Sequence, residues 1–271
     1  MENIKVLPLI EEIQKEGIEK ALELCDMSDR KKGLYIIDKL SKYIVKTHGD
    51  IKADIYVWTE QFKLWKQYCE DHLKTTIAQN MVNMFDKVLS KYSPEVEKFF
   101  EALKAQGLLN NPAYKEQWET LDKNVKKLKT LSRFFGTYRS VSNVWFFIRT
   151  WINDQIKCKG EMVKTEDIFN KKSHLLPIQN NKVLNLKTGK IRERKSDDYF
   201  TFECPVKPFD DNTDTKTIEN FFYGTKTSLF DDKEIADFVL TICGYCLTGD
   251  TSLRKIFVLI GDKNNGKSVL S

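Results

Sequence analysis

Residues 62–94 read FKLWKQYCEDHLKTTIAQNMVNMFDKVLSKYSP, and their apolar side chains recur in steps of three and four. This period is typical of one face of an amphipathic α-helix. The apolar face consists of Phe62, Trp65, Cys69, Leu73, Ile77, Met81, Met84 and Val88. Because proline cannot continue the helical hydrogen-bond ladder, the helix is expected to end near Ser93 and Pro94. The stretch therefore predicts a fold that is mainly α.

A second apolar stripe with the same period predicts another long helix further along the chain. It consists of Leu121, Val125, Leu128, Leu131, Phe134 or Phe135, Tyr138 and Val141. Asn111 and Pro112 predict the start of the helix before this stripe, since proline favours the first helical turn. Three glycines indicate helix ends: Gly33, Gly107 and Gly136.

Shorter patterns complete the first part of the chain. Helical periodicity covers residues 7–24 and 34–45, and residues 54–59 alternate in a way that predicts an isolated short strand. We therefore assign residues 1–158 to a helical N-terminal region.

The character of the sequence changes near residue 159, where turn signals and short alternating runs begin. Residues 183–194 predict a β-hairpin whose turn places Gly189 at a positive φ, and residues 199–202 predict a further strand. Helical periodicity returns over residues 217–222 and 235–247, the latter after a helix-capping signal at Asp231 and Asp232. Residues 159–250 are therefore expected to form a small α+β adaptor.

The last part of the chain joins a strand pattern to a phosphate-binding pattern. Residues 256–260 read IFVLI, a continuous apolar run typical of a buried parallel strand. The next eight residues fit the pattern G-x-x-x-x-G-K-[ST]: Gly261, Asp262, Lys263, Asn264, Asn265, Gly266, Lys267 and Ser268. Such a loop binds phosphates with backbone N–H groups at a helix N-terminus, while its lysine reaches the β- and γ-phosphates and its hydroxyl binds Mg²⁺. The predicted ligands are ATP and, at Ser268, Mg²⁺.

Residues 251–271 are thus expected to begin an α/β ATPase core. The acidic Mg²⁺ ligand and the group that senses the γ-phosphate in such an ATPase would lie beyond Ser271. We therefore expect this chain to carry half of a nucleotide site and to hydrolyse nothing by itself at a useful rate.

The composition limits the class of protein. The 271 residues suffice for one or two domains, and 41% hydrophobic with 31% charged residues excludes collagen-like, disordered and disulfide-scaffold chains. The formal net charge is +5, and 37 of the 44 cationic residues are Lys. No apolar run approaches the roughly 20 residues that cross a bilayer, and the N-terminus lacks a secretory signal. We expect a reducing, cytoplasmic location and no membrane partner.

Two weaker patterns allow a functional or a structural interpretation. Six basic residues could form a path for DNA phosphates: Lys123, Lys126, Lys127, Lys129, Arg133 and Arg139. The neighbouring aromatic residues could stack on bases: Phe134, Phe135, Tyr138, Trp145 and Phe146. The favoured alternative is an ordinary amphipathic helix with solvated lysines and buried aromatic rings. Cys243 and Cys246 have metal-ligand spacing, but no second pair accompanies them, so they are expected to be core thiols.

Residues 175–271 resemble the segment that leads into the ATPase of the poxvirus-type primase-helicases, which are superfamily 3 helicases. The resemblance lies in an ordered series of stretches, namely residues 176–181, 183–189, 198–201, 244–249 and 265–268. Residues 1–150 resemble the helical region upstream of that ATPase only loosely. Lys263 departs from the family, which often has glycine at this point, and its side chain would crowd or contact the phosphates.

The resemblance implies an ATP-driven DNA helicase that forms hexamers at replication forks and is often fused to a primase. It also implies that the region before the phosphate-binding loop packs on the motor as a collar or adaptor, and that single-stranded or forked DNA is the partner. A viral protein of this kind would act in the host cytoplasm or a viral factory. The alternative is a non-enzymatic module that binds single-stranded DNA or mediates oligomerisation, with a vestigial phosphate-binding loop.

Overall fold

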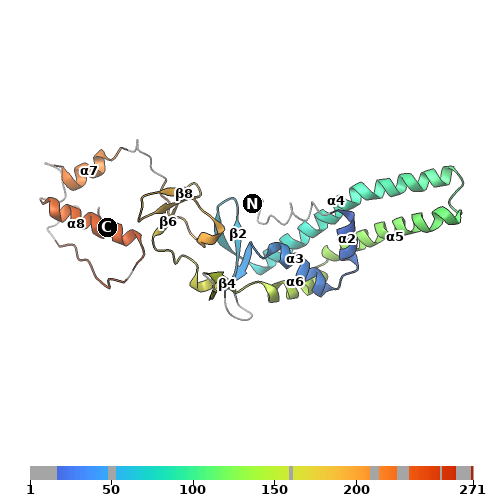
Figure 1. The fold of residues 1–271 in the computed structure, drawn as a ribbon, viewed down its shortest axis with the longest axis horizontal. Helices are drawn as coiled ribbons and strands as arrows, with labels where there is room; N and C mark the ends of the chain where they lie inside the picture. Colours follow the sequence, from blue (N-terminus) through green and yellow to red (C-terminus); the bar gives the residue numbers. More distant parts are fainter. Residues whose placement is uncertain are drawn as a thin grey trace. The chain divides into compact units, whose positions relative to one another are not determined.

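The computed structural model describes residues 17–47, 53–158, 161–207, 214–224, 232–250, 252–260 and 270. The chain divides into two compact units, Met1–Phe169 and Asn170–Ser271. Helices dominate, and the strands form small antiparallel sheets (Figure 1). The prediction of a mainly α fold with a small β component is therefore confirmed. The sequence had placed the first boundary at residues 158–159, whereas the two units divide after Phe169.

The first unit is built on five helices among its described residues. They are α2 (Ile18–Cys25), α3 (Asp29–Leu40), α4 (Glu70–Ala105), α5 (Pro112–Phe135) and α6 (Tyr138–Trp151). The helices α4 and α5 lie side by side and antiparallel, as a long helical hairpin (Figure 1). At its base, the rings of Phe85 and Phe135 stack with centroids 6.0 Å apart. Both rings belong to the main apolar core, which all five helices share.

The start and the end of α4 differ from the prediction. Phe62 and Trp65 precede the helix: Trp65 lies in β3 (Leu64–Tyr68), which pairs with β2 (Ile55–Thr59), and it faces Trp58 there. Phe62 lies in a turn and Trp65 in a strand. They are three residues apart, so their spacing matches the helical period although neither residue is helical. At the other end, α4 runs through Pro94 to Ala105. Pro94 lies on the exposed side of the helix, where a bend is tolerated, and α5 packs along the other side.

The strand predicted at residues 54–59 is confirmed as β2, but it is not isolated. It is the central strand of an antiparallel sheet, between β1 (Ile44–Lys46) and β3. The helix predicted over residues 34–45 is α3, which starts earlier and ends before β1. Of the pattern over residues 7–24, only the part from residue 17 lies within the described residues. A two-stranded sheet of β4 (Gln155–Cys158) and β5 (Glu161–Lys164) and a short 3-10 turn, η1 (Thr165–Asp167), close the unit.

The second stripe belongs to two helices rather than one, since the chain bends between α5 and α6. Asn111 caps α5 as predicted, because its side chain accepts a hydrogen bond of 3.0 Å from the backbone N of Ala113. Gly107 and Gly136 lie at helix ends, as predicted. Gly33 does not: it lies inside α3, at a close approach to α6.

The second unit contains the predicted hairpin. Its sheet has the order β6 (Leu175–Ile178), β7 (Lys182–Asn185) and β8 (Ile191–Glu193), and Gly189 in the turn has a φ of +67°. The strand predicted at residues 199–202 is absent. A 3-10 turn, η2 (Ser196–Asp198), leads into Tyr199 in the left-handed region, and this reverses the chain instead of extending it.

Two helices of the second unit match the predicted helices. They are α7 (Lys216–Tyr223) and α8 (Lys233–Leu247), and the Asp232 side chain caps α8 by accepting from the backbone N of Glu234 at 2.8 Å. The buried strand predicted at residues 256–260 is wrong in this structure. Ile256 is 91% exposed and Ile260 90% exposed, because no strand among the described residues pairs with the segment.

Candidate nucleic-acid interface and nucleotide loop

The predicted phosphate-binding loop, residues 261–268, lies outside the described residues. The structure shows only what flanks it. Residues 256–260 are exposed, and Leu270 is helical and packs on the apolar cluster that Phe222, Ala236 and Val239 form between α7 and α8. The nucleotide site itself stays a prediction.

Three of the six predicted DNA-binding residues meet at one hollow on the first unit. Lys123, Lys126 and Lys127 of α5 line a cavity of about 330 Å³ together with Lys32 of α3. The other residues that line it are Cys25, Thr130, Leu131 and Phe134. Lys32 is 6% exposed, donates to the backbone O of Met27 and lies 5.0 Å from the centre of the Phe134 ring. Sequence analysis did not find Lys32, since it lies on another helix.

Aspartates neutralise much of the charge at this hollow. Lys127 Nζ lies 2.7 Å from Asp26 Oδ1, and Lys126 Nζ lies 2.6 Å from Asp122 Oδ2. These acids compete with any phosphate for the same ammonium groups. The hollow is therefore a weaker attractor of DNA than its count of lysines suggests.

The remaining predicted residues do not join them. Lys129 and Arg133 are exposed on α5, while Arg139 belongs to α6 beyond the bend. Most of the aromatic rings are core residues, but two rings of α6 are open to solvent: Tyr138 is 77% exposed and Phe146 is 67% exposed. The six basic residues thus form no continuous path along one helix face.

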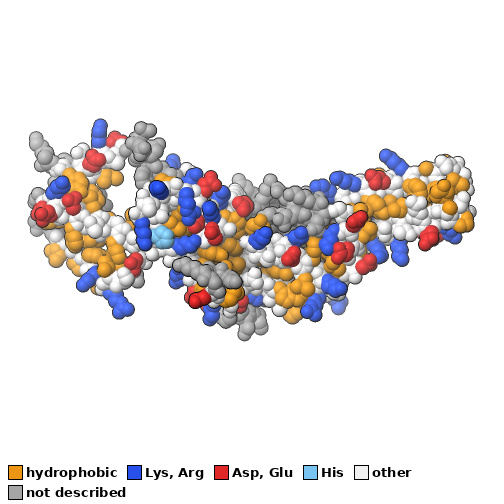
Figure 2. Space-filling model, in the orientation of Figure 1, with side chains coloured by type: hydrophobic (Ala, Val, Ile, Leu, Met, Phe, Trp, Pro, Cys, Tyr) orange, Lys and Arg blue, Asp and Glu red, His pale blue; other side chains and the backbone are white. Residues whose placement is uncertain are grey.

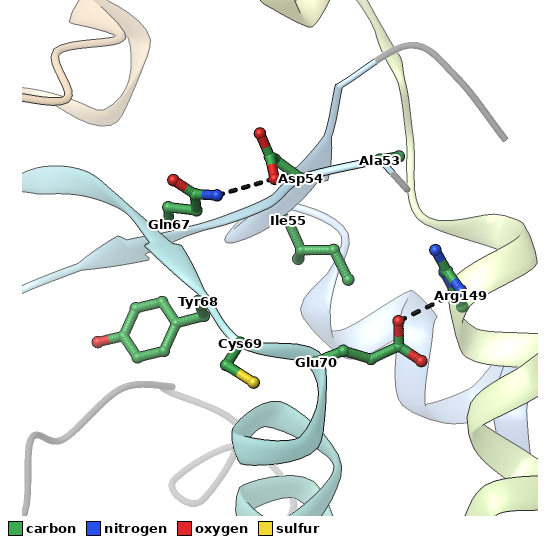
Figure 3. Close-up of a pocket in the computed structure, with 8 residues that line it drawn as sticks. All are labelled: Ala53, Asp54, Ile55, Gln67, Tyr68, Cys69, Glu70 and Arg149. Carbon is green, nitrogen blue, oxygen red and sulfur yellow. Dashed lines mark hydrogen bonds and ion pairs between the residues drawn. The ribbon is translucent and has the colours of Figure 1, made fainter. Parts of the chain in front are cut away.

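A second cavity, of about 450 Å³, lies where β2, β3 and the start of α4 meet α6 (Figure 3). Figure 3 shows Glu70 and Arg149 pointing toward each other across it, with Glu70 Oε2 3.2 Å from Arg149 Nη1. Trp145 Nε1 also donates to Glu70 Oε1 at 2.7 Å, and Gln67 Nε2 donates to Asp54 Oδ1 at 2.8 Å. Because these carboxylates bind neighbouring side chains, the cavity holds a structural clamp between α4 and α6. No local sequence signal reveals it, since its members are far apart in the chain.

The cysteine pair of α8 has no further metal ligands grouped with it among the residues that the structure describes. Within the described ranges, no group of three or more His, Cys, Asp or Glu could hold a metal ion. Both thiols are free, and Cys243 is half-buried against the α7–α8 cluster. Cys246 is exposed, so its prediction as a core thiol is wrong. Burial raises the pKa of another half-buried thiol, Cys25, with a contribution from the nearby Asp26 carboxylate.

None of the helices in the described part of the chain is both long and apolar enough to span a membrane.

The protein is mainly helical and has a small α+β unit. Its described residues form no complete catalytic site. Residues 34–225 match the family model described as D5 N terminal like. The match begins inside α3 and extends beyond α7, so it covers most of the chain. The protein belongs to this family, the N-terminal region that precedes the ATPase in poxvirus-type primase-helicases. No curated protein matches the chain significantly.

The family match confirms the resemblance as far as residue 225 and extends it toward the N-terminus. The sequence stretches that suggested the family begin at residue 176, whereas the match reaches back to residue 34. The helical first unit therefore belongs to the family region as well, although its short apolar patterns carry no distinctive motif.

Proposed function

We propose that this chain is part of a replicative DNA helicase that uses ATP hydrolysis to unwind DNA. The observation that carries the proposal is the order of two features in one chain. The family region ends at residue 225, and a loop of the form G-x-x-x-x-G-K-S follows it at residues 261–268. An N-terminal region followed by a phosphate-binding loop is the arrangement expected of an adaptor joined to its motor.

Each residue of the loop has a role that follows from its chemistry. Lys267 carries the positive charge for the β- and γ-phosphates, and Ser268 supplies the hydroxyl that holds Mg²⁺. The bound Mg²⁺ would neutralise charge that develops on the phosphates.

The two units would act as the collar of the motor, and the complete protein would form a ring, with six subunits as in the family. DNA, single-stranded or forked, is the proposed partner. The acidic Mg²⁺ ligand and the γ-phosphate sensor would come from residues beyond Ser271.

ATP hydrolysis by the protein encoded in the complete reading frame tests the proposal. We expect Mg²⁺-dependent hydrolysis that DNA stimulates, and its loss in a Lys267→Ala variant. Lys98→Ala, which removes an exposed lysine of α4, is the matched control and should hydrolyse ATP like the parent protein. Absence of hydrolysis in the parent protein, or unchanged hydrolysis in Lys267→Ala, would contradict the proposal.

A further inference from the structure

The net charge of the chain is concentrated on one small part of the second unit. Residues 170–207, which contain β6, β7 and β8, carry nine Lys and Arg against four Asp and Glu. Their net charge of +5 equals that of the whole chain, so all other residues together are neutral. Figure 2 shows Lys and Arg side chains gathered over this sheet on the face in view.

Three of the four acidic residues in this region make ion pairs with its basic residues. Arg192 Nη1 and Nη2 donate to both oxygens of Asp198, at 2.8 and 2.7 Å, and Lys172 lies 3.7 Å from the same carboxylate. Arg194, which is buried, pairs with Glu203. A looser pair joins Lys182 and Glu193 at 3.6 Å. Four cations of this region therefore share three carboxylates, and of its four acids only Asp197 is exposed without an ion pair among the described residues.

Five lysines form the outer layer of the same region: Lys171, Lys187, Lys190, Lys195 and Lys207. All five are exposed, and none makes an ion pair with another described residue. They differ in this respect from the lysines of the α5 hollow, where Asp26 and Asp122 occupy two ammonium groups. We call these five residues the lysine surface.

The β7–β8 turn holds two of these lysines in place. The Asn185 side chain accepts from the backbone N of Lys187 at 3.0 Å, and its backbone O accepts from the N of Gly189 at 2.8 Å. The positive φ of Gly189 lets the turn close between Lys187 and Lys190. Because the backbone of the turn is fixed, Lys187 and Lys190 lie together at its tip. Binding a ligand there would cost only the conformational entropy of the two side chains.

We propose that the lysine surface binds the phosphate backbone of nucleic acid without reading its sequence. The identification of the bound polyanion as nucleic acid rests on the proposed function. The location of the binding site rests on the positive charge of the lysine surface. Lysine acts as a point charge toward phosphate and lacks the planar fork with which arginine reads guanine. Five ammonium groups that make no ion pair among the described residues suit a partner whose charges repeat along a chain.

Anisotropy of a labelled single-stranded oligonucleotide, titrated with the full chain at several salt concentrations and without ATP, tests the proposal. The test variant combines Lys171→Gln, Lys187→Gln, Lys190→Gln and Lys195→Gln. The matched control removes the same charge from the α4–α5 hairpin: Lys91→Gln, Lys98→Gln, Lys104→Gln and Lys115→Gln. We expect the test variant to bind roughly ten- to a hundred-fold more weakly and its salt slope to fall by about 3, since each lost phosphate contact on single strands lowers the slope by about 0.7.

The control variant should keep the affinity and salt slope of the parent chain. Equal losses in both variants, no loss in the test variant, or binding to anionic vesicles without binding to DNA would each overturn the proposal. Circular dichroism of both variants shows whether they fold, and all eight lysines are exposed, so folding should be retained. The anisotropy assay contains no ATP, so its result does not depend on whether the protein hydrolyses ATP. A failure of the proposed ATPase function would be seen in the hydrolysis assay instead.

Discussion

Gly33 lies inside α3, at a point where this helix packs close against α6. A Cβ built at this position would lie 2.9 Å from Phe147 Cβ and 3.2 Å from the backbone O of Val144. Both atoms belong to α6, and a backbone carbonyl cannot move aside as a flexible side chain can. The glycine thus sets the distance between two core helices.

We expect Gly33→Ala to destabilise the first unit by about 1–3 kcal/mol, because one added methyl group overpacks this contact. Urea unfolding measures the change. The matched control is Gly244→Ala in α8, where an added Cβ meets nothing within 4 Å. The control should gain up to about 1 kcal/mol from the better helix propensity of alanine. A Gly33→Ala chain as stable as the parent would show that α3 and α6 pack less tightly than described.

The ionisation of Asp198 makes the stability of the second unit depend on pH. Burial by itself raises the pKa of this carboxyl, but hydrogen bonds from Arg192 and from the backbone N of Lys195, with the charges of Arg192 and Lys172, outweigh it. The pKa of Asp198 in the folded chain therefore lies below its ordinary value. Its ionised form stabilises the fold fully above the unfolded pKa of about 3.9, and this contribution is lost as pH falls through the lowered folded pKa.

We expect Asp198→Asn to lower stability at neutral pH and to weaken the acid dependence of unfolding below about pH 4. Denaturation followed at a series of pH values gives both quantities. Asp197→Asn is the control, since that neighbouring side chain is exposed and makes no ion pair with another described residue. Parallel acid profiles for Asp198→Asn and the parent chain would argue against the network.

At the scale of elements, α4 is a 36-residue helix that contains a proline. Pro94 has no N–H for the helical ladder, and its ring crowds the preceding turn. The helix persists because α5 packs along it and because Pro94 faces solvent. Tertiary packing thus overrides a local signal that, in the sequence alone, ends the helix.

Pro94→Ala should stabilise the helical hairpin by about 1–3 kcal/mol, since it restores one donor and removes the ring. Chemical denaturation together with the helical signal in circular dichroism tests this. Pro112→Ala is the matched control: Pro112 is the first residue of α5, where the N–H has no helical partner, so we expect a change within about 0.5 kcal/mol. A loss of stability in Pro94→Ala would mean that the proline serves the packing of α4.

Periodicity and capping signals predicted most helices and the β7–β8 hairpin, because these depend on local chemistry. The failures depend on partners distant in the sequence. Trp65 fits a helical stripe but pairs with Trp58 in a sheet. Residues 256–260 fit a buried strand, but no strand within the described ranges pairs with them. For the site, the sequence offered the basic residues of α5, but it could not show that Asp26, on another helix, neutralises Lys127.

At the scale of the whole molecule, the distribution of charge and the family match both support the proposed contact with nucleic acid. The first unit is a helical body of nearly balanced charge, while the sheet of the second unit holds a surplus equal to that of the chain. The family region ends shortly before the phosphate-binding loop pattern. A chain organised in this way would place a nucleic-acid contact close in sequence to the motor that acts on the same strand.

The most direct test of this account is strand separation of a forked DNA by the protein of the complete reading frame. We expect separation with ATP and Mg²⁺, and none with a non-hydrolysable ATP analogue or in the Lys267→Ala variant. Separation that needs no nucleotide, or hydrolysis of ATP that never separates the strands, would contradict the assignment as a DNA helicase.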